Sequence, residues 1–255
     1  MLGARILLGV AESMVLVGSL TWALTTLGSA LSWRVLVLQG GAMHLGLILG
    51  ALVGIRIESA FDLIAVPLSI LTVPLVAMLL VSRIEKEDRP PSLKKITALE
   101  ILSRIWRPGL VLALATTLLA STVFLLVPVK AAEYWRMPWS AFGALVLGNL
   151  CARISTWHWP GRRGGGSLLV ISLGIEACGQ ASLLTATGPV AQLPGTFLTG
   201  LGYSLIFPIL GMAVLRRLAP DSHDRTIGGY SAFQDLAIGI VLPATAVALA
   251  SLTAS

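Results

Sequence analysis

The sequence predicts an all-α integral membrane protein with about eight transmembrane helices. Of its 255 residues, 56% are hydrophobic and 12% are charged, and the mean hydropathy is +0.88. The apolar residues gather in long segments, as a bilayer core about 30 Å thick requires of a spanning helix. The alternating pattern of a membrane barrel is absent, and isolated strands cannot cross lipid with unpaired backbone groups.

Eight apolar segments are long enough to span the bilayer. They lie near residues 6–28, 34–55, 61–82, 109–131, 139–157, 166–187, 190–215 and 228–252. The longest polar stretch, residues 83–108, separates the first three segments from the last five. We therefore expect a domain of three helices over residues 1–82, a basic linker over 83–108 and a domain of five helices over 109–255.

The second part of the linker has an amphipathic pattern. Residues 93–105 place apolar side chains among charged ones at helical spacing, which is typical of a helix lying along a membrane surface. We expect a helix of this kind on the cytoplasmic surface, ahead of the next span. Most tryptophans also fall at predicted helix ends, where the indole ring prefers the headgroup region; they are Trp33, Trp106, Trp135, Trp139, Trp157 and Trp159.

The basic residues predict the orientation. If residues 83–108 are cytoplasmic, fourteen of the eighteen lysines and arginines lie inside and four lie outside, and cytoplasmic loops carry such an excess. The net charge of +6 is therefore interpreted as a topology signal and not as a nucleic-acid surface. Three crossings precede the linker, so Met1 is expected outside, with an odd number of further spans upstream. A cleaved signal peptide is the weaker alternative, because Glu12 interrupts its apolar region.

Three carboxylates lie inside membrane-length segments: Glu12, Glu176 and Asp235. A charge at the centre of a bilayer helix costs about 2.5–3.5 kcal/mol, and such groups usually line a water-filled path, pair with a cation or carry protons. On a helix, Arg5, Gly9 and Glu12 share one face. The alternatives are that Arg5 reaches the outer interface and that each carboxylate makes a structural hydrogen bond to another helix.

Glycines suggest where helices approach closely. Gly46, Gly50 and Gly54 are four residues apart, so they lie on one face and let two helices touch through their backbones. His44 precedes this stripe and is either a polar cavity contact or a packed histidine. Gly200 and Gly202, with Pro208, are expected to make their span bendable.

The sequence offers no chemistry of an enzyme. Cys151 and Cys178 fall within apolar spans, which argues against a disulfide framework. No metal-ligand spacing, phosphate-binding glycine loop, nucleophile elbow or HExxH motif occurs. We therefore expect no catalytic residue, no metal and no cofactor, and the missing motifs argue against an ATP-driven pump and a membrane protease.

Several motifs resemble those of the major facilitator superfamily, beginning at the fourth of its twelve helices. Arg5 followed by Gly9 is similar to the fourth-helix motif of the family. The stripe Gly46, Gly50 and Gly54 looks like the fifth-helix glycine motif associated with antiporters, with Ala51 in place of the usual proline. Residues 200–208 and 230–236 look most like bacterial arabinose-efflux-permease-like carriers of the YhhS type.

The resemblance covers essentially the whole chain and implies helices four to eleven of a transporter in the bacterial inner membrane. It implies proton-coupled efflux of a small organic solute, such as a sugar or drug, by alternating access. The partners would be the lipid bilayer, the solute and protons, with missing helices supplied by upstream sequence or another chain. The substrate and proton pathway would contain Arg5, Glu12, His44, Glu176 and Asp235. The alternative is a membrane protein that does not transport, either an inactive remnant or an assembly partner that supplies helices.

Overall fold

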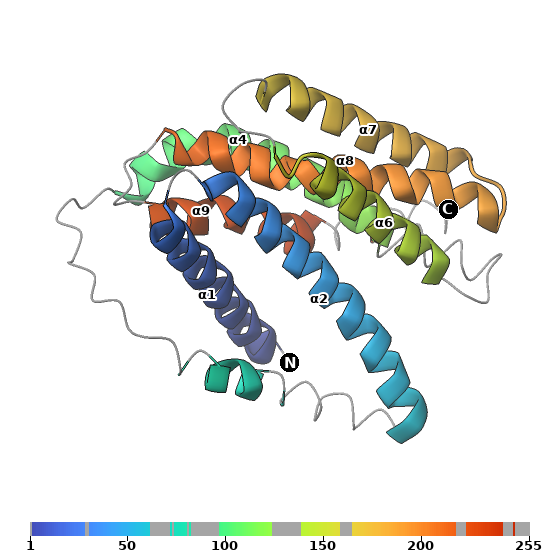
Figure 1. Ribbon diagram of the computed structural model, residues 1–255, viewed down its shortest axis with the longest axis horizontal. Coiled ribbons are helices and arrows are strands. Elements are labelled where there is room, and N and C mark those ends of the chain that lie inside the picture. The colour runs from blue at the N-terminus through green and yellow to red at the C-terminus, as the bar shows by residue number, and fades with distance from the viewer. Residues whose placement is uncertain are drawn as a thin grey trace. The chain divides into compact units, whose positions relative to one another are not determined.

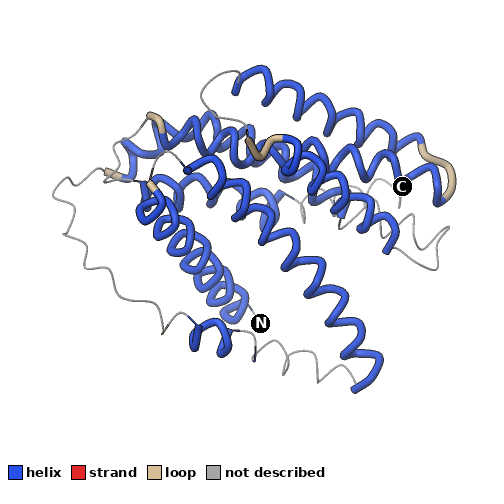
Figure 2. Tube along the Cα trace, viewed as in Figure 1, coloured by secondary structure: helices blue, strands red, loops and turns tan. Residues whose placement is uncertain are grey.

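Every regular element that the computed structural model describes is a helix, so the predicted all-α class is confirmed (Figure 2). The described residues are 2–28, 31–61, 72, 74–80, 82, 97–123, 139–158, 165–217, 223–241 and 247. The chain divides into two compact units, residues 1–41 with 94–255, and residues 42–93. The predicted linker lies largely outside the described residues, so the expected domain division remains a prediction.

The helices follow the predicted spans in order along the chain (Figure 1). They are α1 (Leu2–Leu27), α2 (Ser32–Phe61), α4 (Ala98–Ser121), α6 (Trp139–Ser155), α7 (Gly165–Thr185), α8 (Pro189–Leu215) and α9 (His223–Leu236), with a π-helical turn η4 (Ala237–Val241) after α9. Three described stretches are both long and apolar enough to cross a membrane: Leu99–Ser121, Gly165–Thr185 and Val190–Leu215. Two shorter apolar stretches are Met14–Leu24 and Ser140–Ser155, and parts of the predicted spans 61–82 and 228–252 lie outside the description.

Local sequence explains where these helices begin and end. Gly28 adopts φ +75°, a conformation that glycine reaches without a Cβ penalty, and it ends α1. Gly188 has φ +94°, and Pro189 starts α8, where a missing backbone N–H costs nothing. At the start of α4, the side chain of Thr97 accepts a hydrogen bond from the backbone N–H of Glu100 at 3.3 Å.

The expected surface helix over residues 93–105 is wrong. Helix α4 begins at Ala98 and runs without a break through Pro108 to Ser121. Ile101 and Ile105, two of the apolar residues of the pattern, are buried in the main core with Ile227 of α9, whereas Leu99 and Leu102 are exposed. Part of the apolar face is therefore covered by protein, a distinction that periodicity alone cannot make.

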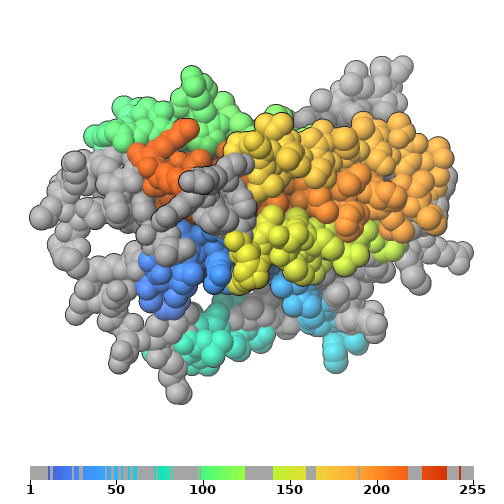
Figure 3. Space-filling view, turned by 45° about the horizontal axis from the view of Figure 1, so that its top comes forward, coloured from blue at the N-terminus to red at the C-terminus, as the bar shows by residue number. Residues whose placement is uncertain are grey.

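Helix α8 is the centre of the larger unit. It packs along α6 on one side and α7 on the other, and it also contacts α4 and α9 (Figures 1 and 3). Most of the apolar window of α8 is buried, whereas α7 exposes apolar side chains such as Val170, Ile171 and Leu184. Such an outer surface suits a helix that faces lipid.

Glycines on α8 decide how closely its neighbours approach. A Cβ at Gly202 would lie 2.5 Å from the backbone N of Glu176 in α7, and one at Gly200 would collide with the backbone O of Leu145 in α6. These glycines therefore form close helix contacts on both sides of α8. The sequence had assigned them to flexibility, because it does not show which backbone lies opposite each glycine.

Candidate functional site

Polar side chains from three helices meet inside the larger unit. They are Thr116 of α4 and Thr122 at its end, Glu176 and Gln180 of α7, and Tyr203 of α8, and we call them the polar layer. Glu176 and Gln180 are one helical turn apart, so both reach the same side of α7. An apolar helix carries such groups inward because lipid cannot satisfy their hydrogen bonds.

Hydrogen bonds tie α4 to its neighbours within the polar layer. The amide nitrogen of Gln180 donates to the backbone O of Leu118 at 3.0 Å and to Oγ1 of Thr122 at 2.6 Å. The Tyr203 hydroxyl pairs with Oγ1 of Thr116 at 3.1 Å. Both α7 and α8 are therefore linked to α4 by specific polar contacts, which fix how each helix is rotated against α4.

Glu176 is the exception in this layer. Its side chain is 0% exposed, and neither carboxyl oxygen has a hydrogen-bond partner among the described residues. Tyr203 of α8 directly follows Gly202, whose Cβ position lies 2.5 Å from the backbone N of Glu176. An ionised carboxylate without a partner is very unfavourable inside a protein, which makes Glu176 the exceptional polar group of the described structure.

A second polar cluster joins the start of α2 to the end of α6, and we call it the α2–α6 clasp. Arg153 of α6 is 6% exposed; its Nε donates to Oδ1 of Asn149 at 2.6 Å, and a terminal nitrogen donates to the backbone O of Val37 in α2. A Cβ at Gly40 would lie 2.7 Å from the guanidinium, so a larger residue there would require the Arg153 side chain to shift. The indole N–H of Trp33 completes the clasp by donating to the backbone O of Thr156 at 3.0 Å.

The clasp corrects two expectations. Arg153 is one of the fourteen basic residues expected in cytoplasmic loops, but it is buried within α6. Trp33 had been placed in the headgroup region, but it is 3% exposed and packs in a core cluster with Val37 and Ala152. In both cases the residue type and position suited an interface, and only the neighbouring helix revealed the burial.

The sequence model of the major facilitator superfamily matches residues 1–242. The chain belongs to the major facilitator superfamily. This membership and the apolar helices make it a multi-pass integral membrane protein, as its composition predicted. No solved structure is a significant match.

Relatives of the chain carry the same family name. It is 31% identical over 243 residues to an uncharacterized MFS-type transporter of Salmonella typhimurium, covering 94% of this chain and 61% of the relative. It is 30% identical over 247 residues to uncharacterized MFS-type transporters of Burkholderia mallei and Burkholderia pseudomallei, covering 95% of this chain and 60% of each relative. This superfamily member therefore spans about three fifths of the length of these relatives.

The predicted pathway residues of this superfamily member are distributed over several helices. Arg5 and Glu12 lie in α1, and His44 lies in the part of α2 that belongs to the smaller unit; these three side chains are outside the described ones. Asp235 lies exposed on α9, whereas Glu176 is buried. The two described carboxylates thus occupy different environments, and Glu176 is the one placed in a polar cluster.

The predicted glycine motif is described only in part. Gly9 lies in α1 and Gly54 in α2, and their surroundings are outside the description. No described atom lies within 4 Å of a Cβ built at Gly46 or Gly50. A helix packing on this stripe therefore remains a prediction.

Sequence reasoning missed Tyr203, Asn149 and Arg153 as site residues of the family member. Asn149 and Arg153 are one turn apart in an otherwise apolar helix, and this spacing was the available signal. Tyr203 gave no such signal, because a tyrosine in a membrane helix is equally compatible with an interface position. Within the described residues, no three His, Cys, Asp or Glu side chains gather into a metal site.

Proposed function

We propose that the chain forms part of a transporter that exports a small organic solute across the bacterial inner membrane in exchange for protons. The observation that carries this proposal is the buried carboxyl group of Glu176, which lacks a partner in the polar layer. Intramembrane carboxylates of this kind serve in proton relays. In this proposal, Glu176 holds a proton in one state of the transporter and releases it in the other.

The position of Glu176 suggests how its environment changes during transport. Its backbone touches α8 at Gly202, where the absent side chain lets the two helices slide past each other. A shift of α8 relative to α7 would move the Tyr203 hydroxyl toward or away from the carboxyl group. A change of partner is what alters the proton affinity of such a group, so helix movement and proton release become linked.

The α2–α6 clasp supplies the second element of the proposal. It connects a helix of the first predicted domain to a helix of the second, through Arg153 and Trp33. With residues 83–108 in the cytoplasm and Met1 outside, both ends in the clasp lie on the cytoplasmic side. We propose that the clasp closes this side and breaks when the transporter opens inward. Arg5, Glu12, His44 and Asp235 are proposed as the remaining polar groups of the pathway.

Transport in proteoliposomes tests this function. The 255-residue chain would be reconstituted and assayed with a panel of radiolabelled sugars and fluorescent drugs under an imposed pH gradient. We expect the gradient to drive solute movement, and we expect Glu176→Gln to abolish this drive while solute exchange without a gradient persists. Glu100→Gln is the matched control, because it removes an exposed carboxylate that pairs with Arg104 at the start of α4.

A second measurement does not require the solute. Infrared difference spectra between acid and alkaline pH report the C=O stretch of protonated carboxyl groups, and we expect Glu176→Gln to remove one such band. If pH-driven transport survives in Glu176→Gln, proton coupling through this residue is excluded. If no solute moves with any variant, the interpretation as a helix-supplying assembly partner gains support.

A further inference from the structure

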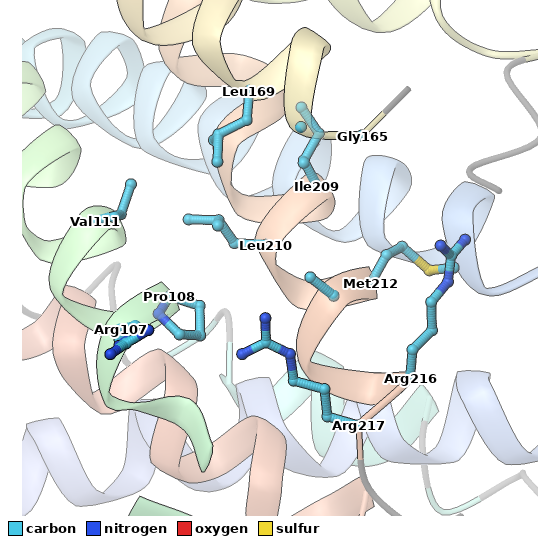
Figure 4. A pocket seen from close by; sticks show the side chains of 12 residues that line it. Arg107, Pro108, Val111, Gly165, Leu169, Ile209, Leu210, Met212, Arg216 and Arg217 are labelled. Atoms are coloured by element: carbon cyan, nitrogen blue, oxygen red, sulfur yellow. The ribbon is translucent and has the colours of Figure 1, made fainter. Parts of the chain in front are cut away.

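A cavity of about 380 Å³ lies where α4, α7 and α8 meet, and none of the residues that line it belongs to the proposed pathway. Its walls are of two kinds. Arg107, Arg216 and Arg217 contribute the charge, and the remaining wall is formed by apolar side chains and the two glycines at the start of α7. In Figure 4, Arg107 and Arg217 lie at the lower edge, and Val111, Leu210 and Leu169 lie above them.

The charge of this cavity is not balanced by its own lining. None of the twelve residues that line it is acidic. Beside the cavity, Glu100 already forms an ion pair with Arg104, at 2.9 Å from Oε1. Arg104 also donates to the backbone O of Arg217 at 3.3 Å. Arg107 and Arg217 lie along the same edge of the cavity, whereas the Arg216 side chain runs toward Met212 (Figure 4). Two guanidinium groups at one edge favour an anion, because guanidinium binds phosphate oxygens in a two-pronged geometry.

The apolar wall of the cavity favours an amphiphilic ligand over a simple anion. Val111, Leu169 and Leu210 offer nothing to a hydrated phosphate ion but would pack against acyl chains. Beside the cavity, Trp106 is 44% exposed and lies 5.2 Å from the guanidinium of Arg107. Exposed tryptophans of membrane helices mark the headgroup level, so the arginines lie at the depth of lipid phosphates.

We propose that this cavity binds an anionic glycerophospholipid, with its phosphate between the arginines and the upper part of its chains against α4 and α7. The first turn of α7, at Gly165 and Gly166, presents backbone N–H groups at the same cavity and adds to the attraction for phosphate. In the proposed orientation this lipid belongs to the cytoplasmic leaflet. Basic pockets between membrane helices on that side hold anionic headgroups in this manner.

The bound lipid would join α4, α7 and α8, which differ in how extensively they pack on one another. Helix α8 packs extensively on α7, whereas α4 and α7 make little direct contact. A phosphate held by Arg107 of α4 and Arg217 beyond α8 would bridge these elements. The site therefore gives membrane composition a direct influence on the packing of the larger unit.

Lipid titration followed by native mass spectrometry tests the proposal on the purified 255-residue chain. We expect phosphatidylglycerol to bind more tightly than phosphatidylcholine with the same acyl chains. Replacing both Arg107 and Arg217 by glutamine should weaken phosphatidylglycerol binding about thirtyfold, at about 1 kcal/mol for each basic residue near an anionic surface. Arg34→Gln is the control, because it removes one positive charge, half of what the double replacement removes, from an exposed position outside the cavity.

A second variant separates a lipid from a free phosphate. Ala213→Leu fills the apolar part of the cavity and keeps all three arginines, so it should weaken phosphatidylglycerol binding. Inorganic pyrophosphate should compete poorly with the lipid. The proposal is overturned if phosphatidylcholine binds equally well, or if Arg34→Gln costs as much as the double replacement. It is also overturned, in favour of a free-anion site, if pyrophosphate displaces the lipid and Ala213→Leu has no effect.

Discussion

The contact between α7 and α8 predicts opposite effects for the same substitution at two positions of α7. Gly179 faces α8, and a Cβ placed on it would lie 2.6 Å from the backbone N of Thr199 and 2.8 Å from the backbone O of Gly195. Gly174 lies exposed on the same helix, with no described atom within 4 Å of its Cβ position. Gly179→Ala and Gly174→Ala therefore differ in packing and share their change in helix propensity.

The expected magnitude follows from these two environments. Alanine in place of a helical glycine stabilises by about 0.5–1 kcal/mol at either site. At Gly179 the neighbouring atoms belong mainly to the backbone, so α8 must move as a unit, and overpacking of this kind costs about 1–3 kcal/mol. The difference in unfolding free energy between the two variants thus isolates the contact and should be about 1–3 kcal/mol, with Gly174→Ala the more stable.

Unfolding in mixed micelles provides the assay. Increasing amounts of sodium dodecyl sulfate would be added to the chain in a mild detergent, and helix content would be followed by circular dichroism. Equal midpoints for the two variants, or a more stable Gly179→Ala, would show that α7 and α8 do not touch through Gly179. The same conclusion would follow if both substitutions shifted the unfolding midpoint in the same direction and by the same amount.

Three further substitutions probe other contacts with the same assay. Arg153→Gln should lose about 1.5–3 kcal/mol, the usual contribution of hydrogen bonds to a charged group, whereas Arg34→Gln, at an exposed site on α2, should lose much less; equal losses would contradict the clasp. Tyr203→Phe removes the hydroxyl that pairs with Thr116 and should cost about 1 kcal/mol, and an unchanged midpoint would mean that this bond contributes nothing. Thr97→Ala removes the cap of α4 and should cost about 1 kcal/mol, with a loss of helix signal that Thr97→Ser largely restores.

Much of the fold could be predicted from the sequence, because helices in a bilayer carry apolar side chains on the surface that faces lipid. A helix in a bilayer must satisfy its own backbone and present apolar side chains outward, so long apolar segments mark helices directly. The described helices fall at the predicted positions, with the largest difference at the start of α4. There the amphipathic pattern of residues 93–105 had two possible partners, a membrane surface or another helix, and the pattern is the same for both.

The candidate site was accessible only in part. Glu176 could be singled out because a carboxylate in an apolar segment is costly wherever it points. Its placement beside Gly202, and the bonding of Gln180 and Tyr203 to α4, depend on which helices are neighbours. Sequence spacing contains no information about contacts between helices far apart in the chain.

The sequence by itself determined that this is a helical membrane protein, that it resembles the major facilitator superfamily and that three of its carboxylates are unusual. Those conclusions rest on composition, periodicity and motifs, which are properties of single segments. Only the tertiary structure decided that Arg153 is buried against α2, that Gly200 and Gly202 are contact points and that arginines of α4 and of the end of α8 line one cavity. Each of these depends on atoms of another helix within a few ångströms, because burial and close contact are relations between segments and are not properties of either one.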